Sequence, residues 1–214
     1  MFSSADFSKD LKIQKLNYQY GEEVDQTLIQ SHLSAIQNVN LHHLSNDDQK
    51  KAFWINCYNG LTNYWIIHFG IKEQMREIAD IFSRPSINIG SYSFSLDDIE
   101  HGILRQNARP RFEKQDDRFQ LMVEQVDPRI HFALNCGALS CPPIAFYNSK
   151  QIETQLDLAE TVFVEQEFIV DNNNKQIICS AIFDWYRADF GEHYLNDPSY
   201  HSYQVSIKPY DWRI

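Results

Sequence analysis

The apolar residues of this chain recur mainly at intervals of three and four, which is the spacing of helices that bury one face. The longest such pattern covers residues 45–69, with Ser45 as the expected N-cap and Gly70 as the expected end. Apolar and aromatic side chains occupy most faces of that predicted helix, so the helix is expected to be buried on most sides. The same spacing predicts further helices over residues 24–36, 71–82, 149–163 and 183–190.

Alternation with a period of two marks a few short segments. Residues 87–94 alternate around a Gly-Ser turn, which predicts a β-hairpin, and Ser95 is the expected cap of a helix through Leu104. Alternation also predicts strands over residues 129–135, 176–179 and 205–207. Because helix outweighs strand and the order is not a repeating βαβ, the expected fold is α+β. It would be a helix-rich single domain packed on a small, mostly antiparallel sheet.

Length and charge narrow the classes of protein. The 214 residues suffice for one domain with an enclosed site. The net charge of −10 argues against a nucleic-acid partner and against docking on anionic membranes. No apolar run is long enough for a membrane span, and no secretory signal is visible. A cytoplasmic protein without a cofactor is therefore expected, or a periplasmic one if a signal peptide has been removed.

The segment 127–143 contains the residues best suited to nucleophilic chemistry, because it holds two of the four cysteines, a histidine and three prolines. Cys136 precedes Gly137, which would let a substrate approach closely and leave a backbone amide for an oxyanion. Cys136 is therefore the candidate thiol nucleophile. Free cysteines often pack as small hydrophobic residues, so a structural role for this thiol stays open.

A thiol nucleophile needs a base to accept its proton, and two histidines compete for that role. His131 is the nearest in sequence and shares a predicted strand face with Asn135, but it would need a bend to reach the thiol. His101 follows Glu100, which could orient a histidine as the third member of a triad does.

Two other roles for the cysteines remain open. His131, Cys136 and Cys141 could supply three metal ligands, although their spacing lacks a Cys-x-x-Cys pair and a fourth ligand. A disulfide between Cys136 and Cys141 is sterically possible, but a reducing cytoplasm disfavours it.

Four blocks of the chain resemble, in order, the signature of one family. Residues 51–59 read Lys-Ala-Phe-Trp-Ile-Asn-Cys-Tyr-Asn, and residues 95–105 contain Ile-Glu-His and Ile-Leu-Arg. Residues 127–143 contain Asp-Pro-Arg-x-His-Phe-Ala-Leu followed by Cys-Gly, and residues 210–212 read Tyr-Asp-Trp. The chain resembles a stand-alone, bacterial-type member of DUF547, a family of unknown function. The resemblance implies a DUF547-like domain over residues 45–214, with residues 1–44 as an N-terminal helical extension packed on it.

The polar residues of these blocks are similar in kind to those of papain-like and transglutaminase-like thiol enzymes. By this analogy the resemblance points to Glu100, His101, His131 and Cys136, the residues that the chemistry also favours. The family often has an aliphatic residue at position 57, so Cys57 is an unsuitable nucleophile.

Asn135 and Gly137, on either side of Cys136, are candidates for substrate binding, and four further polar residues join them. Asn56 and Asn59 lie in the apolar segment 45–69, where their amides either line a cleft or tie down a loop. Arg105 and Arg129 could bind a substrate carboxylate bidentately or form structural ion pairs with the many acidic residues.

The leading hypothesis is a thiol-dependent hydrolase or acyltransferase acting on amide or thioester bonds of a small molecule or peptide. The first alternative is a non-catalytic module that binds a peptide or protein partner around a structural polar network, because Tyr and Trp often anchor interfaces. The second alternative is a metal-binding protein.

Overall fold

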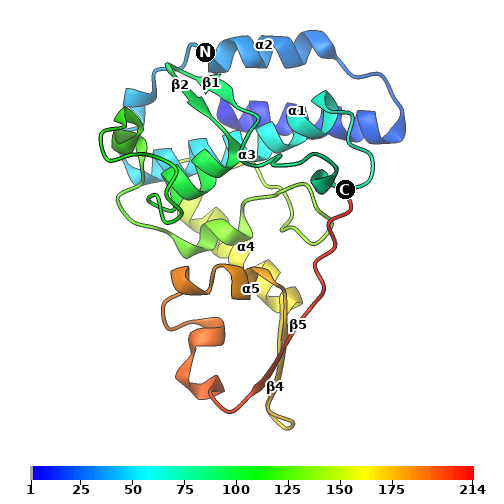
Figure 1. Cartoon of the computed structure of the whole chain (residues 1–214), viewed down its shortest axis with the longest axis vertical. Helices are drawn as coiled ribbons and strands as arrows, with labels where there is room; N and C mark the ends of the chain where they lie inside the picture. The colour runs from blue at the N-terminus through cyan, green and yellow to red at the C-terminus, as the bar shows by residue number, and fades with distance from the viewer. Residues whose placement is uncertain (1) are drawn as a thin grey trace.

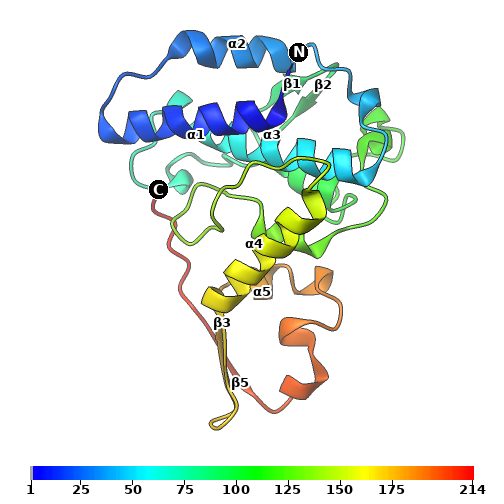
Figure 2. The same cartoon turned by 180° about the vertical axis from the view of Figure 1, so that it is seen from behind.

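The computed structural model describes residues 2–214, and its upper half is helical (Figure 1). Helix α1 (Ser4–Tyr20) lies along helix α3 (Asp47–His68), with α2 (Gln26–Ile36) on its outer side (Figure 2). Nearly all of α3 is buried, and a Cβ at Gly60 would lie 2.5 Å from the Phe7 ring. The absence of a side chain at Gly60 therefore lets the two helices approach closely.

Two short elements follow α3 and pack against it. Strands β1 (Ile87–Ile89) and β2 (Tyr92–Phe94) form an antiparallel hairpin whose turn has Gly90 at a φ of 57°. The next turn, Asp98–Leu104, is π-helical, and the Arg105 amide donates to the Glu100 carbonyl at 3.0 Å. Such wide turns are rare and often lie at functional sites.

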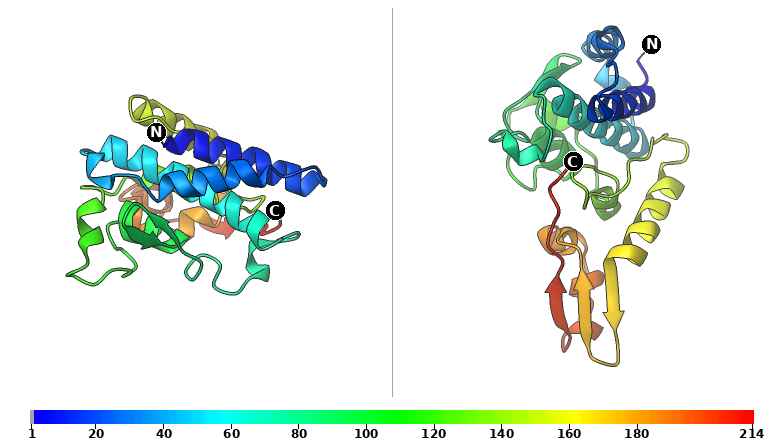
Figure 3. Two further views of the ribbon diagram at one scale, coloured as in Figure 1. Left: turned by 90° about the horizontal axis from the view of Figure 1, so that it is seen from above. Right: turned by 90° about the vertical axis from the view of Figure 1, so that its right-hand side faces the viewer.

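The lower half contains a long helix, a very short one, a three-stranded sheet and several short turns (Figures 1 and 3). Helix α4 (Ile152–Glu167) leads into β3 (Phe168–Asp171), which pairs antiparallel with β4 (Gln176–Cys179). Strand β5 (Gln204–Ile207) lies parallel to β4, and α5 (Ile182–Trp185) is one short turn. Phenylalanine and tyrosine rings around Phe183 form a second core beneath the sheet and α4.

The last residues return to the upper half, so the chain ends near the carboxyl end of α3 (Figure 1). The Leu139 amide donates to the Arg213 carbonyl at 2.7 Å, and the Ile214 amide donates to the Glu73 carbonyl at 2.9 Å. This segment therefore fastens the loop after residue 135 to both halves of the molecule.

The expected α+β class is confirmed, and the hairpin and the strands 176–179 and 205–207 lie where the alternation predicts them. The division at residue 44 stays a prediction. None of the helices over residues 2–214 is both long and apolar enough to cross a membrane.

Several predicted elements are wrong in kind or extent. The predicted strand 129–135 is instead a 3₁₀ turn, Pro128–Phe132, because Asp127 caps it and proline has no amide proton for a strand. Residues 71–82 form only one short turn, Met75–Glu77, and the helix predicted over 183–190 is broken after Trp185.

Two predicted helix caps also lie elsewhere. Asn46, not Ser45, caps α3, and Ser45 instead donates to the side chain of Gln49. Helix α4 begins after Gln151, without the cap expected from Ser149.

Candidate functional site

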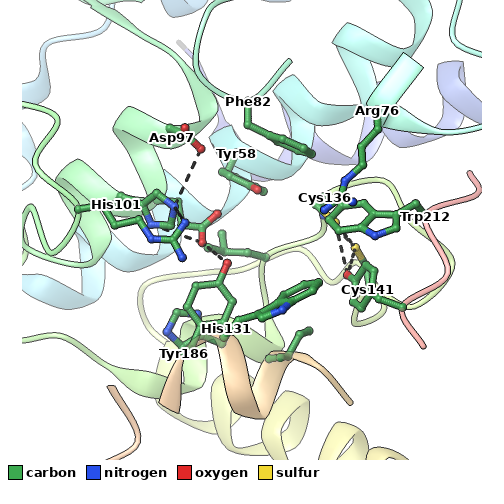
Figure 4. A pocket seen from close by; sticks show the side chains of 16 residues that line it. Tyr58, Arg76, Phe82, Asp97, His101, His131, Cys136, Cys141, Tyr186 and Trp212 are labelled. Atoms are coloured by element: carbon green, nitrogen blue, oxygen red, sulfur yellow. Dashed lines mark hydrogen bonds and ion pairs between the residues drawn. The ribbon is translucent and has the colours of Figure 1, made fainter. Parts of the chain in front are cut away.

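A cavity of about 300 Å³ lies between the α3 half and the short turns of the lower half. Its walls come from α3, the π-helical turn, the loop after residue 135, α5 and the C-terminal segment. Figure 4 shows two chemically distinct ends, one with acids and histidines and one with thiols, aromatic rings and an arginine. At 300 Å³ the cavity is at the small end of ligand pockets.

Glu100 provides a buried negative charge at the first end, with only 6% of the residue exposed. Its Oε1 accepts a hydrogen bond from the Tyr186 hydroxyl at 2.6 Å and lies 3.7 Å from His101 Nδ1. Burial alone would raise the pKa of Glu100, but the electrostatic interaction with the neighbouring imidazole groups of His101 and His131 and the hydrogen bond from Tyr186 outweigh burial and lower that pKa. The carboxylate is therefore ionised at neutral pH.

His101 stays neutral beside this carboxylate. Its Nδ1 lies 3.0 Å from Arg105 Nη1 and its Nε2 lies 3.3 Å from Arg109 Nη1, so a guanidinium donor faces each ring nitrogen. Nε2 lies 4.0 Å from Asp97 Oδ1. Burial lowers the pKa of His101 to about 4 against the opposing effect of Glu100, and the charges of Arg109 and Arg105 add to the decrease. Burial and the charge of Glu100 raise the pKa of Asp97.

His131 forms a dyad with Asp189. His131 Nε2 lies 2.8 Å from Asp189 Oδ2, which also accepts from Arg105 Nε at 2.6 Å. The imidazole stacks on the Tyr186 ring, with centroids 3.8 Å apart. Burial lowers the pKa of His131, although the Asp189 hydrogen bond and the charge of Glu100 oppose the decrease. Within residues 2–214, His131 Nδ1 has no hydrogen-bond partner. This nitrogen of the neutral, oriented imidazole can therefore accept a proton.

The two thiols at the other end form a close pair. Cys136 Sγ and Cys141 Sγ are 2.7 Å apart, and the Tyr210 hydroxyl lies 3.4 Å from the first sulfur and 3.1 Å from the second. The Cys136 amide also donates to Cys141 Sγ at 3.1 Å. Cys141 Sγ is therefore surrounded by a thiol, a hydroxyl and an amide that can each donate to it.

These donors divide the charge unequally between the two sulfurs. Burial alone would raise the pKa of Cys141, but the hydrogen bonds from Cys136, Tyr210 and the backbone outweigh burial and lower it. The hydrogen bond to Cys141 and burial raise the pKa of Cys136. The pair therefore ionises at Cys141, with the remaining proton on Cys136.

Two asparagines, Asn59 in the core and the half-buried Asn135, hold the thiol loop in this shape. Asn59 Nδ2 donates to the Ala133 carbonyl at 3.0 Å, and Asn59 Oδ1 accepts from the Asn135 amide at 2.8 Å. Asn135 then closes the loop, because its Nδ2 donates to the Pro142 carbonyl at 2.7 Å and its Oδ1 accepts from the Gly137 amide at 2.8 Å. The loop brings residues five apart in sequence into contact at their sulfurs.

The predicted catalytic residues meet in one place: Cys136, His131, His101 and Glu100 all line the cavity. Neither thiol has a histidine as a hydrogen-bond partner within residues 2–214. The Cys–His pair of the sequence hypothesis is therefore not formed, and the thiols interact with each other instead.

The asparagine and glycine candidates act on the fold. Asn56 is fully buried and exchanges two hydrogen bonds with the backbone of Tyr147. Asn56, Asn59 and Asn135 therefore tie down loops. Gly137, at a φ of 91°, is packed against Met75 and Ile66. The missing side chain therefore lets the backbone approach the core, where a close approach of substrate was expected. Its amide already donates to Asn135, which leaves it unable to hold an oxyanion.

Both arginines predicted to bind substrate are engaged in ion pairs. Arg105 holds Asp189 bidentately, and Arg129 contacts Asp127, Glu153 and Asp157. Neither lines the cavity of the thiol pair, so the structural alternative holds for both.

Four residues at the site are not predicted from the sequence: Asp97, Asp189, Tyr186 and Tyr210. Asp97 stands one turn before His101 in the Ser95 block, which is a usable signal. On the predicted helix 183–190, Asp189 reads as a surface residue and Tyr186 as part of the apolar face, and Tyr210 is far from the cysteines in sequence. These side chains come together at the site only through the tertiary structure.

The metal alternative is not supported by the geometry. Among residues 2–214 no group of three or more His, Cys, Asp or Glu side chains is arranged to hold a metal ion, and His131, Cys136 and Cys141 are no exception. All four cysteines are free thiols.

We expect the free energy of unfolding to decrease as the pH falls from about 6.5 to about 4, because unfolded His101 binds a proton in this range and folded His101 does not. The difference in pKa corresponds to about 3 kcal/mol. His131 acts in the same direction. Urea unfolding at several pH values should show a smaller decrease for His101→Gln than for the unmodified protein. Equal pH slopes in the two proteins would contradict this assignment.

Comparison with protein-family models assigns the chain to a family by its sequence. The family model described as "Protein of unknown function, DUF547" matches residues 41–164, which include both histidines and both thiols of the cavity. Searches of curated proteins and of solved structures gave no match.

Proposed function

The chain belongs to the DUF547 family, and we propose that it is a thiol-dependent hydrolase or acyltransferase acting on amide or thioester bonds. The observation that carries the proposal is a single cavity lined by a self-activating thiol pair and by a histidine oriented by Asp189. Acyl transfer through a thiol needs a nucleophile and a base, and the cavity offers both.

Each half of the reaction has a group suited to it. The Cys141 thiolate attacks the substrate carbonyl carbon, the bond to the amine or thiol leaving group breaks, and the Cys136 thiol gives its proton to that group. Water then attacks the thioester carbon as His131 takes the water proton, and Cys141 leaves as a thiolate. Because no histidine hydrogen-bonds either thiol within residues 2–214, His131 returns the proton to Cys136 through a bridging water, which restores the starting state.

The pKa directions agree with these roles. A lowered pKa at Cys141 supplies a thiolate near neutral pH, and the raised pKa at Cys136 keeps a proton beside it. The lowered pKa of His131 keeps it in the neutral form that a base requires. An acceptor other than water would make the same chemistry an acyl transfer.

The proposal is tested by trapping the acyl-enzyme. The protein is mixed with S-phenyl thioacetate, quenched with acid and digested, and the acetylated cysteine is identified by mass spectrometry. We expect acetylation within the Cys136–Cys141 pair, its loss in Cys141→Ser, and its retention in the matched control Cys57→Ala. Acetylation only at Cys57 or Cys179, or at no cysteine, would overturn the proposal.

Two observations favour a non-catalytic binding module as the second candidate. No histidine hydrogen-bonds either thiol within residues 2–214, and Trp185 at the cavity is 41% exposed, as an interface anchor would be. A protein that binds peptides in this cavity but is never acetylated would support the module over the enzyme.

A further inference from the structure

Arg76 is a positively charged side chain without a partner at the thiol end of the cavity. The residue is exposed, and its guanidinium carbon lies 3.5 Å from the centroid of the Trp212 ring. Among residues 2–214 no carboxylate lies within ion-pair distance of Arg76, and no hydrogen bond involves its side chain. Acidic residues outnumber basic ones in this chain of net charge −10, yet none of the described acids neutralises this guanidinium.

The other arginines near the site are already engaged. Arg105 and Arg111 bind aspartates at 2.6 and 2.8 Å. Arg109 lies 3.3 Å from His101 Nε2, and its charge acts on Asp97 at the opposite end of the cavity. Arg76 is therefore the guanidinium at the thiol end that is available to an incoming group.

Stacking fixes Arg76 in a direction useful for binding. A guanidinium stacked on an indole keeps its N–H groups in one plane, pointing outward from the ring edge. In Figure 4 the Arg76 side chain descends onto Trp212 at the same end of the cavity as Cys136 and Cys141. The N–H fork thus loses less conformational entropy on binding than that of a free arginine would.

A wall of aromatic rings continues from Arg76 to the sulfurs. The rings of Trp185 and Trp212 stack with centroids 5.8 Å apart, and Tyr210 lies 4.8 and 4.7 Å from them. The Tyr210 hydroxyl contacts both sulfurs, so a flat group on this wall would lie beside the thiol pair. Such a wall binds planar apolar groups.

From this arrangement we infer that the substrate is a small amide or thioester carrying a free carboxylate and a flat apolar acyl group, with the carboxylate bound by Arg76. An N-acyl amino acid has this chemistry. The inference rests on the proposed function, whose substrate it specifies. A planar carboxylate matches the guanidinium fork bidentately.

The charge of the cavity favours a carboxylate over a phosphate. Glu100 and Asp97 line the same cavity of about 300 Å³, so a dianion would be repelled by two acidic groups. A monoanion needs only one guanidinium, and Arg76 lies at the thiol end, whereas Arg109 lies beside His101 at the other end. The volume also limits the ligand to a small amide rather than a long peptide.

The test measures binding of hippurate, which has a phenyl ring, an amide and a carboxylate, against hippuramide, which lacks the charge. Isothermal titration calorimetry is run on the unmodified chain, on Arg76→Gln and on Arg84→Gln. Arg84 is the matched control, because its side chain is 79% exposed, pairs with Asp80 and lies outside the cavity. We expect Arg76→Gln to weaken hippurate binding about tenfold, as loss of a charged hydrogen-bond pair does.

Hippuramide should bind the unmodified chain about as weakly as hippurate binds Arg76→Gln, and Arg84→Gln should bind hippurate normally. Absence of hippurate binding, equal binding by Arg76→Gln, or equal affinity for the two ligands would overturn the inference. Binding requires no turnover. A chain that binds hippurate through Arg76 but forms no acyl-enzyme refutes the proposed function, and one that forms acyl-enzyme but ignores the carboxylate refutes this inference.

Discussion

Replacing Asp189 with alanine is expected to lower the free energy of unfolding by about 3–5 kcal/mol, the usual cost of removing one partner of a buried ion pair. Asp189 accepts two hydrogen bonds from Arg105 and one from His131. Arg105 is 6% exposed and His131 is 3% exposed, so neither can turn to solvent when the carboxylate is lost. The guanidinium would be left buried without an opposite charge.

Removing the Asp189 carboxylate should also disturb the other side chains of the cavity, because they are linked to it by hydrogen bonds and stacking. Arg105 donates to His101, and His131 stacks on Tyr186, which in turn holds Glu100. Urea unfolding measures the effect, with Asp184→Ala as the control, since Asp184 is exposed and lies five residues earlier. If the two variants lose similar amounts of stability, Asp189 does not organise the site as described.

The fold could be predicted where local signals and burial agree. The hairpin 87–94 has both an alternating pattern and a glycine at the turn, and α3 has both an apolar periphery and Gly70 after its last turn, at a φ of 66°. Ser95 and Asp98 cap each other's backbone as expected, but the turn that follows is π-helical, which no spacing in the sequence signals.

Prediction failed where a pattern had two explanations. Residues 129–135 alternate like a strand, yet a proline and a capping aspartate turn them into a 3₁₀ turn whose apolar side chains still point inward. Residues 71–82 carry a helical stripe because single apolar residues anchor an irregular loop to the core.

Some residues of the candidate site could be predicted from the sequence and others could not. Glu100, His101, His131 and Cys136 could be found because they lie in blocks rich in chemistry-bearing residues. The thiolate could not be assigned to Cys141 from sequence, because its donors include Tyr210, 69 residues away, and a loop closed by Asn135. Asp189 was hidden for a similar reason, since its partners lie 58 and 84 residues earlier.

A large difference in alkylation rate is expected between the thiols of the folded protein. At neutral pH iodoacetamide should alkylate Cys141 at least about a hundredfold faster than Cys57, because Cys57 is fully buried and becomes accessible only when the protein opens. Cys141 lines the cavity and carries the thiolate of the pair. Tyr210→Phe removes one of its donors and should slow the reaction at neutral pH by raising the pKa of Cys141.

Whether the thiolate lies at Cys141 is tested by the pH dependence of alkylation at each cysteine of the folded protein, followed by mass spectrometry. The thiol pair described here predicts that Cys141 reacts first, with an apparent pKa below that of an ordinary thiol, and that Cys136 reacts only at higher pH. Titration of Cys141 at or above the ordinary thiol value, or faster alkylation of Cys136, would contradict a thiolate held at Cys141 and the thiol chemistry built on it.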